Sequence, residues 1–445
     1  MKTTLKLFIT TVTAFALSTS NLIAQQDTTV RMTAKLDNNS ICPNKQESYL
    51  YLNLNGCHVG KRVPLNISVV FDRSGSMEGE RMHHGKKAIE YLIDQLEPDD
   101  IMSLVIYDHE AYVLHSSEPV TDKHALKRKL EHITPRGTTN LSAGLDLGIQ
   151  EVVSTYNKNK INRVFLFTDG QPNEGITDHY LLEKIASEHA HKFDVSISTF
   201  GLGHEYNEFL MHDIAESGAG NYYYIQTPTD IINVMSMEIQ KVKSVVAQNA
   251  KLIIDFPTQN LTLSKIYGQP YKIVNGQIYI DLKEIHPEES TGILIKFINS
   301  NPSESPITIK SRLTYFSCIS QSISVIDLTN TLSQSTDAAS CAQQYNSDVL
   351  EQMVYYTSHY LLESAVKETD NNNIPAAQRK VAEAKQVISQ SPVPPDNSPL
   401  LSDQSQIINE YDSHLSTWHT KSETERRHIQ KKIHYTNYNL RKNKQ

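Results

Sequence analysis

The fold is decided by the stretch Val69-Val70-Phe71-Asp72-Arg73-Ser74-Gly75-Ser76-Met77. An apolar run ends abruptly there in one carboxylate, two hydroxyls and a glycine, which is typical of a buried parallel strand that delivers polar groups to the rim of a sheet. Asp72, Ser74 and Ser76 alternate along the chain, so their oxygens can converge from one tight loop onto a hard cation. The stretch therefore predicts a buried strand followed by a candidate cation-binding loop.

The surrounding residues, 63–243, alternate predicted strands with predicted helices. We expect strands at residues 64–72, 101–107, 111–115, 161–168, 195–202 and 222–225, and helices at residues 77–96, 123–133, 141–156, 179–191, 208–217 and 230–243. This alternation predicts an α/β fold with a doubly wound, mostly parallel sheet that helices cover on both faces. Such folds place their sites beyond the carboxyl ends of the strands.

The flanking segments have other patterns. Alternating apolar and polar residues predict an all-β sandwich over residues 245–330, in which Asn275-Gly276 is a hairpin turn because a tight turn needs positive φ. The α/β domain is expected to span residues 63–244. The other expected segments are a signal peptide at 1–24, a small N-terminal β segment at 25–62, a linker at 331–344, a helical hairpin at 345–390, and a Pro-rich linker with a basic helical tail at 391–445.

The first 24 residues indicate export. Lys2 and Lys6 precede a short apolar run at residues 7–17, and small residues lead to an expected cleavage after Ala24. The run is too short to span a bilayer comfortably, so we expect no transmembrane segment after cleavage. We therefore expect an exported protein, periplasmic or at the cell surface or beyond it. The formal net charge of −8 argues against nucleic acid as the main partner.

Four cysteines agree with an oxidising compartment: Cys42, Cys57, Cys318 and Cys341. Four cysteines allow three connectivities, and the simplest joins the two local pairs. A disulfide that closes a loop as short as that between Cys42 and Cys57 contributes about 3 kcal/mol in the chain-entropy model. The spacings lack a Cys-x-x-Cys knuckle, so zinc is not expected.

Three loops of the predicted sheet supply oxygen ligands. The first loop contains Asp72, Ser74 and Ser76, the second contains Thr139 just before a helix, and the third contains Asp169 at the end of a strand. The fold would bring all three to one rim. Such ligands suit Mg²⁺, Mn²⁺ or Ca²⁺ rather than zinc or copper. Two carboxylates and three hydroxyls cannot enclose a divalent ion alone, so waters or an outside carboxylate must complete its shell.

These loops resemble a known family. Their motifs are Asp72-Arg73-Ser74-Gly75-Ser76, Gly137-Thr138-Thr139-Asn140-Leu141 and Thr168-Asp169-Gly170. They resemble the metal-ion-dependent adhesion site of von Willebrand factor type A (VWA) domains. The resemblance continues through Phe200-Gly201-Leu202-Gly203 and Tyr206-Asn207-Glu208, so it covers residues 63–243. It points to the exported bacterial branch, in which a β-sandwich and a C-terminal helical region follow the A domain.

The resemblance implies an adhesion-type module that binds a protein through a metal ion. It implies that Asp72, Ser74, Ser76 and Thr139 hold the ion, and that Asp169 does so directly or through water. An Asp or Glu side chain of a protein partner would then fill the remaining position. The alternative is a structural scaffold of the cell envelope, whose contacts are made by the β-sandwich and the C-terminal helices.

Enzymatic motifs are incomplete, so we do not expect an enzyme. Residues 79–87 have the wrong spacing for a phosphate-binding loop, and Lys87 stands where Ser or Thr is required. Ser74 and Ser76 have no activating histidine in a motif. Helix histidines that lack the His-Glu-x-x-His pattern of zinc proteases are expected to be exposed: His83, His84, His189 and His191.

Overall fold

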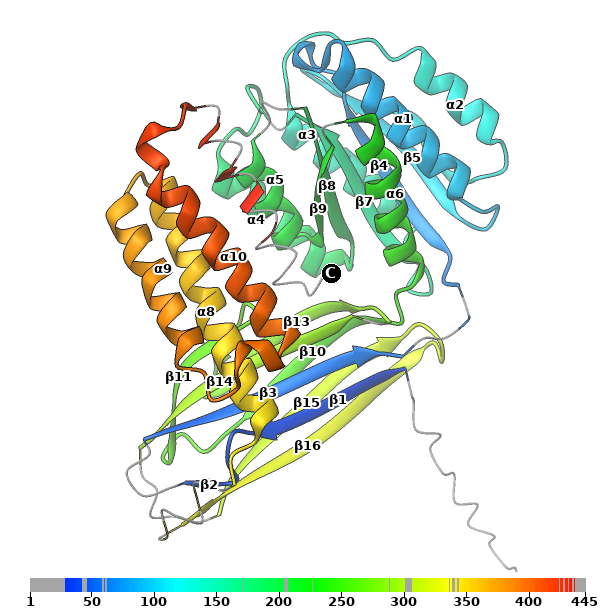
Figure 1. The fold of residues 1–445 in the computed structure, drawn as a ribbon. Coiled ribbons are helices and arrows are strands. Elements are labelled where there is room, and N and C mark those ends of the chain that lie inside the picture. The colour runs from blue at the N-terminus through cyan, green and yellow to red at the C-terminus, as the bar shows by residue number, and fades with distance from the viewer. Residues whose placement is uncertain are drawn as a thin grey trace, which may run out of the picture.

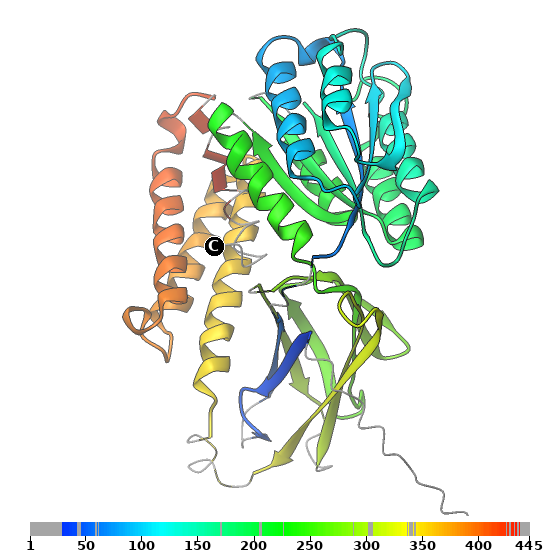
Figure 2. The same cartoon turned by 90° about the vertical axis from the view of Figure 1, so that its right-hand side faces the viewer.

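The structure is a computed structural model, shown from two sides in Figures 1 and 2. It describes residues 29–41, 46–57, 60, 62–169, 171–203, 207–225, 227–287, 289–300, 306–335, 337, 341, 344–423, 425–426, 429–430, 432–433 and 436. The expected signal peptide and Cys42 lie outside the described residues. An α/β domain stands above a β-sandwich, and a bundle of helices runs along one side (Figure 1).

The α/β domain is built on a six-stranded sheet of order β6-β5-β4-β7-β8-β9. Its strands are β4 (Leu65–Asp72), β5 (Ile101–Tyr107), β6 (Ala111–Pro119), β7 (Ile161–Thr168), β8 (Ser196–Leu202) and β9 (Ala219–Ile225). All neighbours are parallel except β5 and β6. The central strands β4 and β7 are buried over their whole length, which explains their apolar runs at residues 69–71 and 164–167. The predicted doubly wound α/β fold is confirmed.

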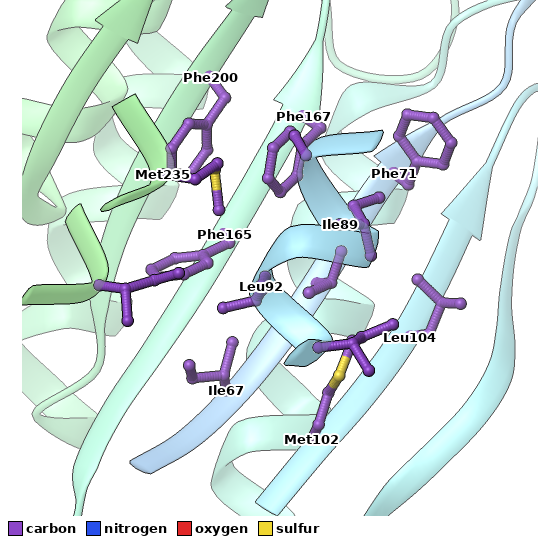
Figure 3. Close-up of a cluster of buried hydrophobic side chains, with 14 of the residues drawn as sticks. Ile67, Phe71, Ile89, Leu92, Met102, Leu104, Phe165, Phe167, Phe200 and Met235 are labelled. Atoms are coloured by element: carbon purple, nitrogen blue, oxygen red, sulfur yellow. The ribbon is translucent and has the colours of Figure 1, made fainter. Parts of the chain in front are cut away.

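Helices cover both faces of this sheet. They are α1 (Glu80–Gln95), α2 (Lys123–Glu131), α3 (Leu141–Ser154), α4 (His179–Phe193), α5 (Glu208–Ser217) and α6 (Pro228–Lys243). One hydrophobic cluster joins α1, α2 and α6 to the sheet, and a second joins α3, α4 and α5 to the other face. Figure 3 shows the first cluster, in which Leu92 and Met235 lie around Phe165. The Phe167 and Phe200 rings stack there with their centroids 4.4 Å apart.

Helix α3 packs unusually closely on the sheet. A Cβ atom at Gly148 would lie 2.1 Å from Val70 Cγ2, and one at Gly144 would lie 2.4 Å from Tyr107 Cδ1. Only glycine permits this approach, because any other residue would force the helix away. The close packing sets the N-terminus of α3, and with it the loop before the helix, at the carboxyl edge of the sheet.

The β-sandwich consists of two sheets, of order β1-β3-β14-β11 and β12-β13-β10-β15-β16-β2. The strands are β1 (Val30–Leu36), β2 (Ser40–Ile41), β3 (Glu47–Gly56), β10 (Ala247–Asp255), β11 (Leu261–Tyr267), β12 (Lys272–Val274), β13 (Gln277–Ile285), β14 (Ser290–Asn299), β15 (Ile307–Ser317) and β16 (Ser322–Gln334). The predicted hairpin turn joins β12 to β13, with φ of 52° at Asn275 and 79° at Gly276.

The N-terminal strands belong to this sandwich. Strand β3 pairs along its length with β14, so the β segment that we expected at residues 25–62 belongs to the sandwich domain rather than to a segment leading into the α/β domain. The sequence did not reveal this pairing because the partner strand follows the whole α/β domain, and no local pattern reports such a distant contact. The α/β domain is therefore an insertion between two strands of the sandwich.

The C-terminal helices form a bundle of three rather than a hairpin and a separate tail. They are α8 (Ser347–Asp370), α9 (Ile374–Ser389) and α10 (Pro399–Ser416). Tyr411 of α10 is buried, and its hydroxyl lies 2.6 Å from Thr369 Oγ1 of α8. The bundle also packs on the sandwich through Tyr49, Leu294 and Tyr356. None of the helices in the described part of the chain has the length and apolar character needed to cross a membrane.

The expected local cysteine pairs are not formed. Cys57 and Cys318 are free thiols, whereas Cys341 is disulfide-bonded. Cys318 lies before the first residue of β16 and Cys341 beyond the last, so all thirteen residues of the strand lie between them. At about 3.3 Å per residue the two ends of that strand are roughly 40 Å apart, which separates the two cysteines far beyond the reach of a disulfide.

Candidate metal site

Asp72 is the buried centre of the candidate site. It ends β4, and hydrogen bonds fix both of its carboxylate oxygens. The backbone N–H of Ser74 donates to Oδ1 over 2.8 Å, while Oδ2 accepts from Thr168 Oγ1 over 2.6 Å and from the Tyr107 hydroxyl over 3.3 Å. The carboxylate is therefore held in one orientation by groups from three neighbouring strand ends.

The two serines of the first loop lie side by side. Ser74 Oγ and Ser76 Oγ are 3.1 Å apart, and Ser74 is buried whereas Ser76 is exposed. Met77, the next residue, is fully buried and anchors the loop in the domain core. The loop thus presents one hydroxyl inside the rim and one at the solvent boundary.

The second loop is hydrogen-bonded to the first. Arg136 donates its backbone N–H to the Arg73 carbonyl over 2.7 Å, and Gly75 donates its own to the Gly137 carbonyl over 3.1 Å. Thr139 follows and is buried, and its backbone N–H donates to Asn173 Oδ1 over 2.8 Å. These bonds set the loop of Thr139 directly beside that of Ser74 and Ser76.

Asp169 comes from the end of β7 and is fully buried. Its Oδ2 lies 3.4 Å from Arg81 Nη1, and its backbone carbonyl accepts from the Asn207 N–H over 3.3 Å. Its Oδ1 is buried with no hydrogen-bond partner. A buried carboxylate oxygen without a partner is costly, so this atom points to a missing ligand such as a cation.

The two carboxylates affect each other. Burial, together with the nearby negative charge of Asp169, raises the pKa of Asp72 to about 6 despite the opposing hydrogen bonds from Thr168 and Ser74. Burial, with the Asp72 charge adding to it, also raises the pKa of Tyr107 well above its usual value. The ionised pair is unfavourable by itself, and a cation between the loops would relieve it.

The residues present fit a hard divalent ion. The five predicted side chains offer carboxylate and hydroxyl oxygens only, as Mg²⁺, Mn²⁺ and Ca²⁺ prefer. The described residues contain no group of three or more His, Cys, Asp and Glu side chains arranged to hold a metal. Three of the five candidate ligands are instead Ser or Thr hydroxyls.

Asp108 organises the rim, and it was not predicted from the sequence. Arg136 Nε donates to this buried carboxylate over 2.8 Å, and Arg73 Nη2 and His109 Nδ1 lie 2.7 and 2.6 Å from its oxygens. Although burial opposes the shift, hydrogen bonds and the nearby arginine charges lower the pKa of Asp108. Its position directly after the strand next to that of Asp72 was the signal that could have revealed it.

The neighbouring histidines His83 and His84 of α1 differ in their exposure to solvent. His83 is exposed as expected, but His84 is buried because it faces the domain from α1. Gly79, where a phosphate-binding loop was considered, precedes the first turn of α1 with φ of 81°.

Comparison with known proteins identifies the domain. Residues 66–236 match the family model of the von Willebrand factor type A domain, so the chain contains a VWA domain. The protein sll0103 of Synechocystis sp. is 32% identical over 211 residues, which make up 47% of this chain and 49% of that protein. The chain therefore spans about half the length of this relative. VWA domains are commonly protein-interaction modules.

Solved structures share the fold well beyond that domain. A von Willebrand factor type A protein from Catenulispora acidiphila has a TM-score of 0.67 at 13% identity, over 85% of this chain and 89% of that chain. VWA2, a paralogue of ArnB from Sulfolobus acidocaldarius, has a TM-score of 0.57 at 18% identity, over 87% of this chain and 96% of that chain. At these identities the likeness shows the fold alone.

Proposed function

We propose that the chain is an exported, metal-dependent, adhesion-type binding module and not an enzyme. One observation supports this above the others: a buried, hydrogen-bonded Asp72 faces a second buried carboxylate, Asp169, one of whose oxygens has no partner. A site with excess buried negative charge and an unused oxygen is matched to a divalent cation.

In this proposal the ion is bound by oxygen atoms of all five candidate side chains. Asp72 and Ser74 supply oxygens from inside the rim, Ser76 from its outer side, and Thr139 from the neighbouring loop. Asp169 binds directly or through a water. The physiological ion is proposed to be Mg²⁺, with Mn²⁺ and Ca²⁺ as alternatives of the same chemistry. When bound, the ion supplies a positive centre that an outside carboxylate can join.

The partner is proposed to be a protein that presents an Asp or Glu side chain. Gly75 and Ser76 are exposed on the outer side of the rim, so a ligand can approach from there.

Export is proposed from the sequence of the first 24 residues. The disulfide-bonded state of Cys341 supports it, because such bonds persist in oxidising compartments such as a periplasm or the cell surface.

Calorimetry on the full chain tests the ion site. We expect Mg²⁺ and Mn²⁺ to bind the wild type, and the conservative variants Asp72→Asn and Asp169→Asn to bind at least a hundredfold more weakly. Asp146→Asn is the matched control, because Asp146 is a half-exposed carboxylate of the same domain on α3. Absence of divalent-ion binding by the folded wild type would overturn the proposal.

A structural envelope scaffold is the second candidate function. It is favoured by apolar side chains exposed on the sandwich strand β16, where Ile323 is 74% and Val325 is 53% exposed. In that case the double variant Ile323→Ser and Val325→Ser should abolish partner recovery, and EDTA should not. If the metal site binds the partner, EDTA and Asp72→Asn remove it and the β16 variant does not.

A further inference from the structure

Arg81 contacts the candidate site from the first turn of α1. Its Nη1 donates to the Ser76 carbonyl oxygen over 2.7 Å and lies 3.4 Å from Asp169 Oδ2. The Arg81 side chain is 24% exposed, whereas that of Asp169 is fully buried. The guanidinium therefore bridges the serine loop and the third loop at the edge where a cation would bind.

The loop after β8 leaves room for this arginine. Gly203 has φ of 84°, and a Cβ atom there would lie 2.7 Å from Arg81 Nε and 3.1 Å from Arg81 Cγ. A side chain at this position would push the arginine away from Asp169. Two features thus place Arg81: its hydrogen bond to the Ser76 carbonyl, and the lack of a side chain at Gly203.

The other arginines at this rim are engaged elsewhere. Arg73 and Arg136 both pair with Asp108, whose charge they offset. Among the ion pairs formed by the described residues of the rim, the one that reaches Asp169 comes from Arg81. The two carboxylates of the site, Asp72 and Asp169, are therefore partly balanced by one fixed positive charge.

We propose that Arg81 is an internal counter-cation that sets the ion affinity of the site. It balances the charge of Asp169 when no ion is present, and it opposes a divalent ion that enters beside it. The inference rests on the proposed function in one respect, namely that the site binds a divalent ion. Like charges this close repel by an amount that corresponds to about a tenfold change in affinity even in a well-screened environment.

If Arg81 only positions Asp169, the change in ion affinity on removing Arg81 should have the opposite sign. If Arg81 served only to hold Asp169 in the orientation needed for the ion, its removal would weaken ion binding. The direction of the change therefore separates the two roles.

The test compares Arg81→Gln with the wild type in the full chain, titrated with Mg²⁺ by calorimetry. We expect the variant to bind Mg²⁺ about tenfold more tightly, and Arg81→Lys, which keeps the charge, to stay near the wild type. Lys87→Gln is the matched control, because it removes an exposed positive charge from the same helix at a distance from the site. Unchanged or weaker Mg²⁺ binding by Arg81→Gln would overturn the inference.

Thermal melting in EDTA separates this inference from the proposed function. Without a divalent ion, Arg81→Gln should melt at a lower temperature than the wild type, because buried Asp169 loses its partner, and Lys87→Gln should not. If neither the wild type nor Arg81→Gln binds Mg²⁺, the proposed function fails. The melting result still decides the counter-cation role, since equal melting temperatures in EDTA contradict it.

Discussion

The two ends of strand β7 hold opposite charge arrangements. Near its start, the fully buried Arg163 donates to Glu238 Oε1 over 2.8 Å and also pairs with Glu284 of the sandwich. At its end lie the buried carboxylates Asp72 and Asp169, and among the described residues the ion pair to Asp169 comes from the partly exposed Arg81. Although burial opposes the shift, Glu284 and Glu238 raise the pKa of Arg163. The start of β7 contains its own buried cation, Arg163, whereas the end of β7 has the excess negative charge that could bind one.

This difference separates a structural ion network from a binding site. The ion network of Arg163, near the start of β7, is the lower network. It is enclosed and joins two domains, because Glu238 belongs to α6 and Glu284 to β13 of the sandwich. Tyr223 and Asn221 add hydrogen bonds to Glu238 Oε2 over 2.7 and 2.9 Å. The candidate metal site at the end of β7, the upper site, has an unpartnered oxygen on Asp169 and an exposed serine, Ser76. Breaking the paired network near the start of β7 would leave a buried charge without its partner, whereas the site at the end of β7 can still accept a cation.

The largest expected effect comes from removing Arg163, the buried cation near the start of β7. Arg163→Met leaves Glu238 buried without its partner and should lower the free energy of unfolding by about 3–5 kcal/mol. Urea denaturation in EDTA measures it. Arg312→Met is the control, because its pair with Asp327 is exposed and should contribute little. A loss as small as that of the control would show that the network does not stabilise the domain junction.

A smaller effect is expected from pH at the upper site. The pKa of Asp72 is about 6 in the folded protein and about 3.8 in the unfolded chain, so between these values the folded state keeps a proton that the unfolded state has lost. In EDTA the free energy of unfolding should therefore fall as pH rises from about 4 to about 6, by about 3 kcal/mol at most.

The difference between the wild type and Asp72→Asn in urea titrations isolates that slope from other groups. With Mg²⁺ present the dependence reverses, because the ion binds the ionised carboxylate and its affinity should rise with pH up to about 6. A wild type and an Asp72→Asn variant with the same pH dependence in EDTA would show that Asp72 does not titrate in this range.

The smallest effects come from a matched pair of tyrosines. Tyr223→Phe removes a 2.7 Å hydrogen bond to a buried carboxylate and should cost about 1.5–3 kcal/mol, with or without Mg²⁺. Tyr107→Phe removes a longer bond of 3.3 Å to Asp72 and should cost less than about 1.5 kcal/mol. Chemical denaturation of both variants gives the comparison. A larger loss at Tyr107 would contradict the assignment of the tighter network to the lower end.

Short-range patterns predicted the α/β domain well. The buried strands β4 and β7 contain the apolar runs 69–71 and 164–167, and Asp72 and Asp169 follow close behind these runs. The sequence therefore shows both the strand and the polar group at its end. The loops of Ser74, Ser76 and Thr139 were also expected at one rim, because strand ends of a parallel sheet meet there, and the structure places these loops side by side.

Long-range features could not be predicted in the same way. The pairing of β3 with β14 joins residues separated by a whole domain, and α10 packs on α8 after a proline-rich turn that suggested a linker. Arg163, Glu238 and Glu284 are distant charged residues whose meeting depends on how two domains dock. Arg81 looks like an ordinary residue of an exposed helix face, and only its contact with Asp169 distinguishes it.

The insertion of the α/β domain has a consequence for the order of assembly. As the chain emerges from its N-terminus, β1 and β3 can pair at once, but the second edge of β3 must wait for β14. An open strand edge is a template for unwanted pairing. The α/β domain is synthesised in between, and its folding brings the two ends of the long loop together and so lowers the entropic cost of closing the sandwich. Folding of the inserted α/β domain would therefore favour closure of the sandwich.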